Sequence, residues 1–456
     1  MSAVRLCQFI RCTTWAELPQ TVQAQVVRCL LDTLGVALAG RATELSRIVH
    51  DFAAEVFAGR RARLWQDGRE VSPPGAALAN GLTIDSLDIH DGHPLTKGHA
   101  SAAVVPAAFA MLGVGDGVVS GEEFLTALAV GYEVALRAGV ALHATAADYH
   151  TSGAWNALGC AVVGARRLGL ADEVVLHALG IAEYHGPRSP MMRCIDHPTM
   201  LKDGSGWGAM AGVSAALLAR RGFTGRPAAT IEGSDSEHFW ETLGDRWEFL
   251  HQYFKPHAVC RWTQPSLEGA LQLRDRNRLS ADRITRIRIE TFHEATRLAV
   301  RAPHNTEEAQ YSLPFAVAAA LVFGTVEADQ VTGQALTDPR VLRLVGLIEL
   351  CEDTDLSARF PGLRFAHVSI ETDDGEWRQV RHAQPRWDAV EPPTDRELLD
   401  KFRRLTHHLS QPRRQELEDR ILDCAHLKDV SVLAELLATA CEPMKQLRNP
   451  SGKHPV

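Results

Sequence analysis

The sequence lacks the cysteine spacing that would brace a small secreted fold or hold a structural metal. Its nine cysteines are scattered along 456 residues, with no CxxC pair and no zinc-knuckle spacing. A disulfide framework or a structural zinc site is normally visible as regularly spaced cysteines. The pattern therefore predicts reduced thiols, as in a cytoplasmic protein.

An excess of one charge and a long apolar run are lacking too. The 48 Lys and Arg against 56 Asp and Glu give a net charge of -8, with the two signs interspersed. A nucleic-acid binder would need a basic face, so we expect no nucleic-acid partner. No uninterrupted apolar run reaches the roughly 18 residues that a membrane span needs, and the N-terminus does not resemble a signal peptide. We expect a cytoplasmic protein without a membrane partner.

The sequence does show helical periodicity over its first 250 or so residues. The segment 18–40 carries one apolar stripe and ends in a glycine, a helix-stop signal. The stripe consists of Val22, Val26, Leu30, Leu34 and Ala37. Ser120 and Glu123 have capping-box spacing at the start of the apolar segment 120–142. Segments rich in Ala and Gly lie between such helices and would let them pack closely, so we predict an all-helical domain.

The pattern changes after Lys255. The segment "RITRIRIET" alternates apolar and charged residues as a half-buried strand does, and "HVSIETDDGEWRQVR" does so around an Asp374-Gly375 turn. Two helix-like segments, "SLPFAVAAALVFG" and "DPRVLRLVGLIEL", lie between them, and the tail returns to helix after a Pro-bearing linker. The prediction is a mainly α fold with an α+β insertion: an all-helical domain of 1–258 and 394–456, and a smaller α+β lid domain of 259–393.

One short stretch, "DIHDGHPLTKGHAS" at 88–101, gathers titratable groups that packing does not require. Asp88, Asp91, His93 and His99 could suggest a metal. However, the stretch contains a proline and a glycine, has no i, i+4 ligand pair and has no distant Cys/His partner set, so we predict no metal. The alternative is structural: the two aspartates cap the following helix and the backbone satisfies His99.

A second motif, "DYHTSGAWNALG", places Tyr149 and His150 before a helix start. Here the structural alternative is that Thr151 or Ser152 caps that helix. A third, "TMLKDGSGWGAMAG", resembles a dinucleotide fingerprint, but no strand precedes it. The better interpretation is that Lys202 stands beside a Gly-rich helix whose free N–H groups face an anion.

A fourth motif, "YFKPHAVCRW", supplies Lys255, His257 and Arg261 near the expected domain boundary. A solvated basic hinge is its structural alternative. Taken together, the four motifs combine fixed positive charge, imidazoles and carboxylates at loops and helix ends. Such a set suits a small polycarboxylic acid, because ammonium groups stabilise the charge of an enolate-like intermediate while imidazoles move protons.

The motifs also carry a family resemblance over nearly the whole chain. "LLDTLGVALAG", "ANGLTIDSLDIHDGHPLTKGHASAAVVPAAFA", "YHTSGAWNALGCAVVGARRLGL", "MLKDGSGWGAMAG", "FKPHAVCRW" and "EEAQYSLPFAVAAAL" follow in the order and spacing of the MmgE/PrpD family. That family includes 2-methylcitrate dehydratase, cis-aconitate decarboxylase and iminodisuccinate epimerase. The resemblance implies a helical domain built from both chain ends, an α+β lid, no metal or organic cofactor, and a homodimer.

The resemblance also implies roles for individual residues. The expected catalytic residues are Asp88, His99, His150, Lys202 and Lys255. The expected substrate-binding residues are Asp91, His93, Tyr149, Lys202, Lys255 and Arg261. In this interpretation the two lysines hold substrate carboxylates, His99 and His150 are the acid/base candidates, and Asp88 orients His99 or assists in proton transfer.

Three departures from the family pattern bear on the reaction. Gly92 stands where the dehydratase and decarboxylase loops carry a threonine, Gln264 replaces a histidine that commonly follows "CRWT", and Phe315 replaces a tyrosine associated with the decarboxylase. They disfavour decarboxylation. The first expectation is a cofactor-independent dehydratase of the 2-methylcitrate type, acting on a small di- or tricarboxylate. Epimerisation and decarboxylation are the alternatives within the family, and a non-catalytic carboxylate-binding protein is the alternative outside it.

Overall fold

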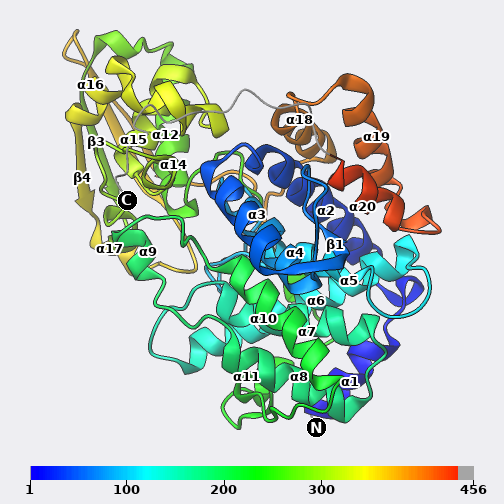
Figure 1. The fold of residues 1–456 in the computed structure, drawn as a ribbon. Helices are drawn as coiled ribbons and strands as arrows, with labels where there is room; N and C mark the ends of the chain where they lie inside the picture. The colour runs from blue at the N-terminus through cyan, green and yellow to red at the C-terminus, as the bar shows by residue number, and fades with distance from the viewer. Residues whose placement is uncertain (1, 440–456) are drawn as a thin grey trace.

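The two ends of the chain and its middle build different parts of the molecule. The structure is a computed structural model that describes residues 2–439. The helical part begins with α1 (Ser2–Cys12), α2 (Gln20–Gly40), α3 (Glu44–Val56), α4 (Pro73–Asp85), α5 (Ser101–Met111) and α6 (Gly121–Thr145). It continues with α7 (Gly153–Arg167), α8 (Asp172–His185), α9 (Met192–Asp196), α10 (Ser205–Ala219) and α11 (Ala229–Glu232). Figure 1 shows this part below and to the right of the sheet.

Small residues and a buried apolar stripe hold the helical part together. Every residue of the stripe predicted on α2 is buried, and α2 ends at Gly40 as expected. At Gly212 of α10, an added Cβ would lie 2.3 Å from the carbonyl oxygen of Ala157 in α7. These two helices therefore pack with their backbones nearly in contact, which only glycine permits there. At the start of α6, the Ser120 side chain accepts a hydrogen bond from the Glu123 amide, as the spacing predicted.

The expectation of an all-helical first part was wrong at one place. β1 (Ala58–Arg63) and β2 (Glu70–Val71) form a two-stranded antiparallel ribbon beside α4 and α5. Within β1 only Ala62 is buried, and the strand carries exposed arginines. The ribbon therefore leaves no alternation of apolar and polar residues from which a strand could be predicted.

The middle of the chain forms a mixed four-stranded sheet with helices against it. The strands are β3 (Ile284–Thr291), β4 (Ile348–Glu352), β5 (Ala366–Thr372) and β6 (Trp377–Ala383), in the order β4-β3-β5-β6. Its helices are α12 (Gln264–Asn277), α13 (His293–Thr296), α14 (Thr306–Gln310), α15 (Leu313–Phe323), α16 (Pro339–Leu347) and α17 (Thr354–Ser357). The predicted strand and the hairpin around Gly375 are confirmed, as is the mainly helical fold class with an α+β region.

The segment expected as one helix at 338–350 divides into two elements. α16 ends at Leu347, and the chain continues directly as β4, which runs parallel to β3 with Ile287 opposite Ile348. β4 is an edge strand with only its first residue buried. It therefore lacks the alternating pattern, and its leucine spacing continues that of the helix.

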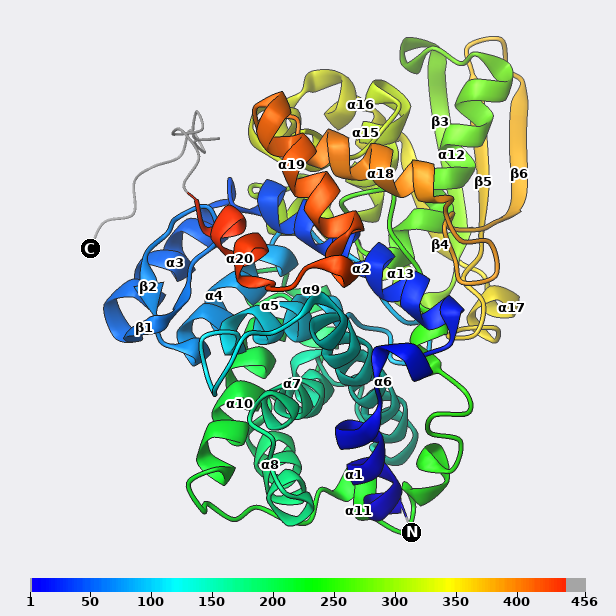
Figure 2. The same ribbon diagram turned by 90° about the vertical axis from the view of Figure 1, so that its right-hand side faces the viewer.

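The last helices return to the helical part. They are α18 (Asp395–Leu405), α19 (Gln411–Leu422) and α20 (Ser431–Ala438), and Figure 2 shows α18 and α19 beside α2. Lys401 of α18 donates hydrogen bonds to Asp32 Oδ1 in α2 at 2.5 Å and to the carbonyl oxygen of Ile89 at 2.6 Å. Helix α18 is thus tied to the loop that precedes α5.

Within residues 2–439, two helices are long and apolar enough by composition to cross a membrane. They are α2 and α6, and 72% and 89% of their most apolar windows are buried inside the protein. α15 and the helical segment Ala328–Thr337 are together long and apolar enough to cross a membrane, but only as one span that is broken by a sharp bend between them. Packing within the protein accounts for the apolar character of α2 and α6.

Candidate active site

Asp88 lies at the centre of a buried ionic cluster. The Lys255 ammonium donates to Asp88 Oδ1 at 2.5 Å and to the Asp88 carbonyl oxygen at 2.9 Å. Burial alone would raise the pKa of Asp88, but the positive charges of Lys255 and Lys202 outweigh burial and hold that pKa below its usual value. The backbone of Asp88 is left-handed, with φ of 49°, a conformation that costs a non-glycine residue about 1 kcal/mol. Asp88 therefore serves the cluster and does not cap α5.

His99 presents one free ring nitrogen to this cluster. Its Nδ1 hydrogen-bonds to the carbonyl oxygen of Asp91. A carbonyl can only accept, so Nδ1 carries the proton and Nε2 of the neutral ring has a free lone pair. Nε2 lies 3.7 Å from Asp88 Oδ1 and 3.5 Å from Asp203 Oδ2. Burial and the charge of Lys255 lower the pKa of His99 to about 3, so the ring is neutral at physiological pH.

Asp203 is a site residue that the sequence did not reveal. Its Oδ2 accepts a hydrogen bond from Ser152 Oγ at 3.0 Å, and the same Ser152 oxygen accepts from the His99 amide at 3.0 Å. Ser152 therefore links Asp203 to His99 and does not cap α7 with its side chain. Burial, reinforced by the nearby carboxylates of Asp85 and Asp88, raises the pKa of Asp203. A carboxyl group that retains its proton thus faces an imidazole that remains neutral.

Lys202 lies at the start of α10, where the sequence placed it. Its ammonium donates to the side-chain oxygen of Gln310 and lies 4.9 Å from the ring centre of Tyr311. The helix start was predicted to face an anion, and the carboxylate of Asp85 is an anion that the Ser205 backbone affects, because that backbone lowers the pKa of Asp85. Burial raises the pKa of Asp85, and Lys202 opposes that effect.

A small cavity opens beside the cluster, between the helical part and the α+β part. It is lined by Asp88, Lys97, His99, Tyr149, Met191, Ile195, Asp203, Tyr253, Cys260, Arg261, Trp262 and Tyr311. Lys202 and Lys255 lie just behind this lining, at 1% and 0% exposure. Four of the five predicted catalytic residues are therefore neighbours at one cavity: Asp88, His99, Lys202 and Lys255.

His150 is the predicted catalytic residue that does not reach the cluster. It is half-buried, its ring stacks near His143, and the charged groups that act on its pKa are Arg188 and Asp148. Burial lowers that pKa. In this conformation His150 is not part of the cavity lining.

The predicted substrate-binding residues divide in the same way. Tyr149 and Arg261 line the cavity, whereas Asp91 and His93 are buried behind it. The Asp91 carboxylate accepts from the Tyr132 hydroxyl at 3.1 Å, and burial raises its pKa to about 6. His93 Nε2 lies 3.6 Å from a Glu248 oxygen. Asp91 and His93 thus support the loop from inside.

The basic-hinge alternative for the fourth motif was also wrong, because the side chains of Lys255, His257 and Arg261 are all buried. The Arg261 guanidinium donates to the carbonyl oxygens of Phe254 and Arg386 and to Asp388 Oδ2, at 2.9–3.2 Å. Arg261 therefore joins the segments around the cavity.

The three departures from the family pattern have structural explanations. At Gly92 an added Cβ would lie 2.6 Å from the Tyr253 ring and 2.7 Å from His99 Nδ1, so glycine allows these two side chains to approach. The Gln264 amide binds the carbonyl oxygens of His257 and Val259 and accepts from Arg261. Phe315 is fully buried in α15. Gln264 and Phe315 are structural here.

One trio of side chains has the composition of a metal site. Asp88, His90 and His99 each offer a ligand atom, and these atoms lie within 4.8 Å of one another. Both ring nitrogens of His90 are buried without a hydrogen-bond partner among the described residues. However, Lys255 already occupies Asp88 Oδ1, and its ammonium would repel a divalent cation at that point. The electrostatics therefore favour an anion near the trio, and we assign no metal to it.

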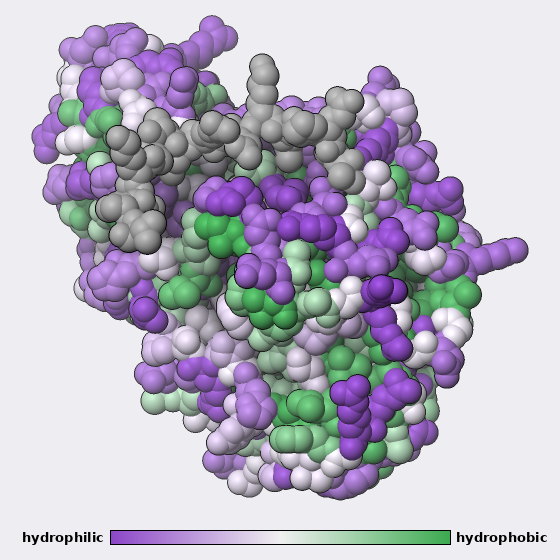
Figure 3. Space-filling model, in the orientation of Figure 1, coloured by the Kyte–Doolittle hydropathy of each residue, from purple (hydrophilic) through white to green (hydrophobic). Residues whose placement is uncertain are grey.

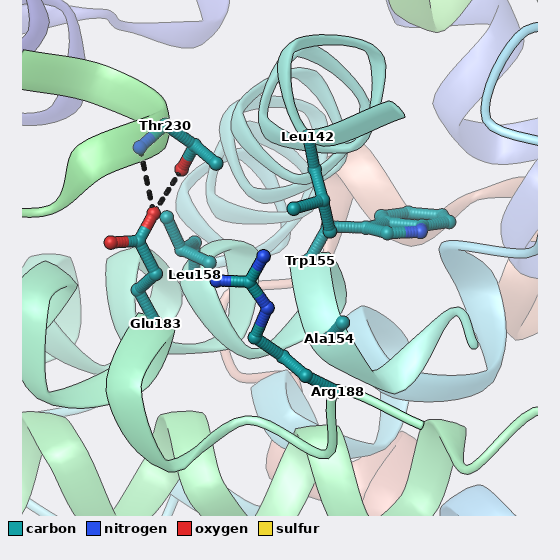
Figure 4. Close-up of a pocket in the computed structure, with 7 residues that line it drawn as sticks. All are labelled: Leu142, Ala154, Trp155, Leu158, Glu183, Arg188 and Thr230. Carbon is teal, nitrogen blue, oxygen red and sulfur yellow. Dashed lines mark hydrogen bonds between the residues drawn. The ribbon is translucent and has the colours of Figure 1, made fainter. Parts of the chain in front are cut away.

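A second, smaller hollow has a different lining (Figure 4). It is bounded by α6, α7 and α8, with Leu142, Trp155 and Leu158 as its apolar wall. The Glu183 carboxylate at its edge accepts from the amide and hydroxyl of Thr230 at 2.8 and 2.5 Å. This hollow holds no cluster of reactive groups.

Comparison with known protein families identifies the family of this chain. The model of the MmgE/PrpD N-terminal domain matches residues 4–249, and that of the MmgE/PrpD C-terminal domain matches residues 257–427. The chain belongs to the MmgE/PrpD family. The expected resemblance is therefore confirmed.

Curated relatives extend over nearly the whole chain. A cis-aconitate decarboxylase-like protein, oryM, from Aspergillus oryzae is 25% identical, covering 95% of this chain and 96% of the relative. The cis-aconitate decarboxylase of Homo sapiens is 26% identical over 93% and 92% of the two chains, and that of Aspergillus terreus is 22% identical over 95% of each. The protein is thus an MmgE/PrpD family enzyme whose relatives in this comparison are decarboxylases.

Proposed function

We propose that this enzyme is a cofactor-independent lyase that removes carbon dioxide from a small unsaturated tricarboxylate of the cis-aconitate type. The observation that carries the proposal is the buried group of His99, Asp203 and two lysines at one cavity. The full-length similarity to cis-aconitate decarboxylases supports decarboxylation ahead of the dehydration expected from the sequence.

The geometry suits each step of such a reaction. When the bond to the departing carboxylate breaks, its electron pair remains on carbon and spreads into the conjugated carboxylate that stays. The ammonium groups of Lys202 and Lys255 would stabilise this negative charge in a buried, low-dielectric site. The Asp203 carboxyl would then donate its proton to carbon, with the His99 imidazole beside it to return a proton from solvent.

Dehydration of a hydroxy acid of the 2-methylcitrate type is the second candidate. Elimination of water needs a base for the C–H proton and an acid for the departing hydroxyl. The neutral His99 and the Asp203 carboxyl, 3.5 Å apart, offer both. Epimerisation would use the same base and return the proton to the opposite face. A non-catalytic role is opposed by four charged or titratable groups buried at one cavity at an energetic cost.

Incubation with cis-aconitate, 2-methylcitrate, citrate and iminodisuccinate in deuterated water, followed by NMR, distinguishes these reactions. Decarboxylation gives carbon dioxide and a product with one deuterium at the protonated carbon. Dehydration gives an alkene signal, and epimerisation gives deuterium uptake without net conversion. Tight binding of these acids without any of the three outcomes would support the non-catalytic alternative.

We also propose that the enzyme acts as a cytoplasmic homodimer. The face in Figure 3 carries several apolar patches among polar side chains. On α10 and the turn before it, Met200, Leu201 and Trp207 are 39–54% exposed, and large exposed apolar side chains mark association surfaces. Light scattering coupled to size-exclusion chromatography should give twice the chain mass, and a strictly monomeric species would contradict the dimer.

A further inference from the structure

The cations that were expected to clamp substrate carboxylates already have partners inside the protein. Lys255 pairs with Asp88 at 2.5 Å, and Arg261 pairs with Asp388 at 3.1 Å. Lys202 binds the neutral side-chain oxygen of Gln310. Two of these three cations are neutralised by a carboxylate of the protein. A substrate with two or three carboxylates therefore needs more positive charge than Lys202, Lys255 and Arg261 provide. Other cations, without an acidic partner, would have to supply the rest of that positive charge.

Lys97 is such a cation in the cavity lining. Its ammonium makes no hydrogen bond or ion pair with any residue that the structure describes, and it lies 4.5 Å from the ring centre of Tyr149. The Tyr149 hydroxyl donates to the Lys97 carbonyl, which fixes the residue in a left-handed conformation with φ of 51°. Burial and the positive charge of Arg364 lower the pKa of Lys97, whereas Glu294 raises it. The backbone is thus held in a strained form that keeps an unpaired ammonium at the cavity.

Arg364, in the α+β part, is a second cation without an acidic partner, and it lies outside the lining of the cavity itself. It precedes β5, is 5% exposed and donates to the carbonyl oxygen of Pro94 at 2.8 Å. Its Nε is buried without a hydrogen-bond partner, and no described carboxylate pairs with it within 4.0 Å. Its charge acts on Lys97 and on Tyr149 and Tyr253, which are all cavity-lining groups. An unpaired buried guanidinium is costly, and an anion beside it would remove that cost.

We propose that Lys97 and Arg364 together form a second carboxylate-binding subsite of the cavity. A carboxylate here would receive hydrogen bonds from an ammonium and a guanidinium, the strongest such pairing in proteins. The reacting end of the substrate would lie at His99 and Asp203, near Lys202 and Lys255, and a distal carboxylate would lie between Lys97 and Arg364. The inference rests on the proposed function and narrows its substrate class to acids with at least two separated carboxylates.

The arrangement couples the two parts of the protein. Lys97 comes from the loop before α5, and Arg364 comes from the α+β part next to β5. A ligand carboxylate that contacts both would bridge the helical part and the lid. Acids with one carboxylate could occupy only one of the two ends, so they should bind weakly.

Calorimetric binding tests the subsite without requiring turnover. Propane-1,2,3-tricarboxylate, glutarate and butyrate serve as probes for the wild type and for K97M, R364M and R364K. The tricarboxylate should lose at least about tenfold in affinity in K97M and in R364M, and butyrate should bind wild type and variants equally weakly. R364K, which keeps the charge, should recover part of the affinity. K428M and R60M, which remove exposed cations outside the cavity lining, should bind as the wild type does.

The outcomes separate this inference from the proposed function. If the wild type binds the tricarboxylate and both K97M and R364M bind it equally well, the subsite is refuted while the proposed function stands. If the wild type binds no polycarboxylate, the proposed function itself fails. Should R364M not fold, as judged by circular dichroism, the half-buried Lys97 decides the question alone through K97M and K97R. On a turned-over substrate, K97M should raise KM and leave kcat within about threefold.

Discussion

Nε2 of His99 lies 3.5 Å from Oδ2 of Asp203, so an imidazole and a carboxyl group face each other with both side chains buried. The same environment acts on them in opposite directions. Burial keeps the imidazole neutral, and burial together with neighbouring carboxylates keeps a proton on the carboxyl group. Two groups whose pKa values are moved apart in this way are a ready acid/base pair.

His99→Asn should reduce turnover and leave binding largely intact. The free Nε2 of the ring is the group next to the reacting cluster, and a general acid/base contributes on the order of 10²–10⁴-fold to rate. Lys202→Met should instead raise KM as well, because it removes charge that binds the substrate and stabilises the intermediate. Steady-state kinetics on the substrate identified by NMR measures both. Near wild-type kcat in His99→Asn would remove His99 from the chemistry and return attention to His150 or Asp88.

The pH dependence of the wild type follows from the same residue. Because the pKa of His99 is lowered from 6.5 to about 3, the neutral ring persists as pH falls through 6.5 and is lost only near 3. The activity profile should therefore show no acid limb with an apparent pKa near 6.5 while the fold remains intact. A limb at that value, absent in His99→Asn, would show that the imidazole titrates as an exposed group does.

Asp203→Asn tests the carboxyl partner. Asparagine can still accept from Ser152 but cannot donate a proton to carbon, so kcat should fall on the order of 10²-fold or more with a small change in KM. The pKa of Asp203 is raised, so wild-type turnover should decline on the alkaline side as this acid ionises. Asp196→Asn, at an acid paired with Arg297 near the surface, is the matched control and should keep normal kinetics. Equal activity in both variants would exclude Asp203 as the proton donor.

Asp88, His99, Lys202 and Lys255 were predictable because each lies in a motif dense in titratable residues. In the sequence, Asp203 looks like an ordinary residue at a helix start. Its place in the site becomes visible only in the structure, where its Oδ2 lies 3.5 Å from Nε2 of His99, a residue 104 positions earlier in the chain. Lys97 lies in the same stretch as Asp88 and His99, but nothing in the sequence gave it a role, and Arg364 belongs to no motif. What distinguishes both is the lack of an acidic partner, which only their three-dimensional placement reveals.

The fold, like the site, was predictable only where a local sequence pattern marks the element. Helices with a buried stripe and strands with clear alternation were found from their period, and α2 and β3 are examples. β1 and β4 were missed because neither shows a clear alternating pattern. Each is held in its strand conformation by its partner, β2 for β1 and β3 for β4. His150 was placed at the site by resemblance, but its position depends on a loop whose geometry no local pattern specifies.

Gly92→Ala should disturb the site through packing. The added Cβ would lie 2.6 Å from the Tyr253 ring and 2.7 Å from His99 Nδ1, so one of the two rings must shift. We expect at least a tenfold loss of kcat/KM, because small displacements of catalytic groups are costly. Gly346→Ala, in α16, adds a Cβ with nothing within 4 Å and no left-handed backbone, so it is the matched control. Unchanged kinetics in Gly92→Ala would show that the loop adapts without moving His99.

Activity should survive exhaustive chelation. The Asp88 oxygen that a metal would need is held by Lys255, and nearby ammonium charge disfavours a divalent cation. Dialysis against EDTA, followed by elemental analysis and assay, should give undiminished turnover. A stoichiometric bound zinc or iron, with activity that is lost and restored with it, would reassign Asp88, His90 and His99 as ligands.

Lys401→Met should destabilise the protein strongly. Lys401 is 1% exposed, and its ammonium binds Asp32 in α2 and the carbonyl oxygen of Ile89. Removing one member of a buried ion pair leaves an uncompensated charge, which typically costs about 3–5 kcal/mol. Equilibrium denaturation should show this loss for Lys401→Met, and Lys428→Met, at an exposed lysine, should be close to neutral.

The double variant Asp32→Asn with Lys401→Met separates the ion pair from mere packing. Because it removes the stranded carboxylate as well, it should recover part of the stability lost in Lys401→Met. Activity should recover less, since the bond to Ile89 is still missing and Ile89 lies between Asp88 and His90 in the loop that forms the site. A double variant no more stable than Lys401→Met alone would show that the lysine acts through its contact with the loop and not through Asp32.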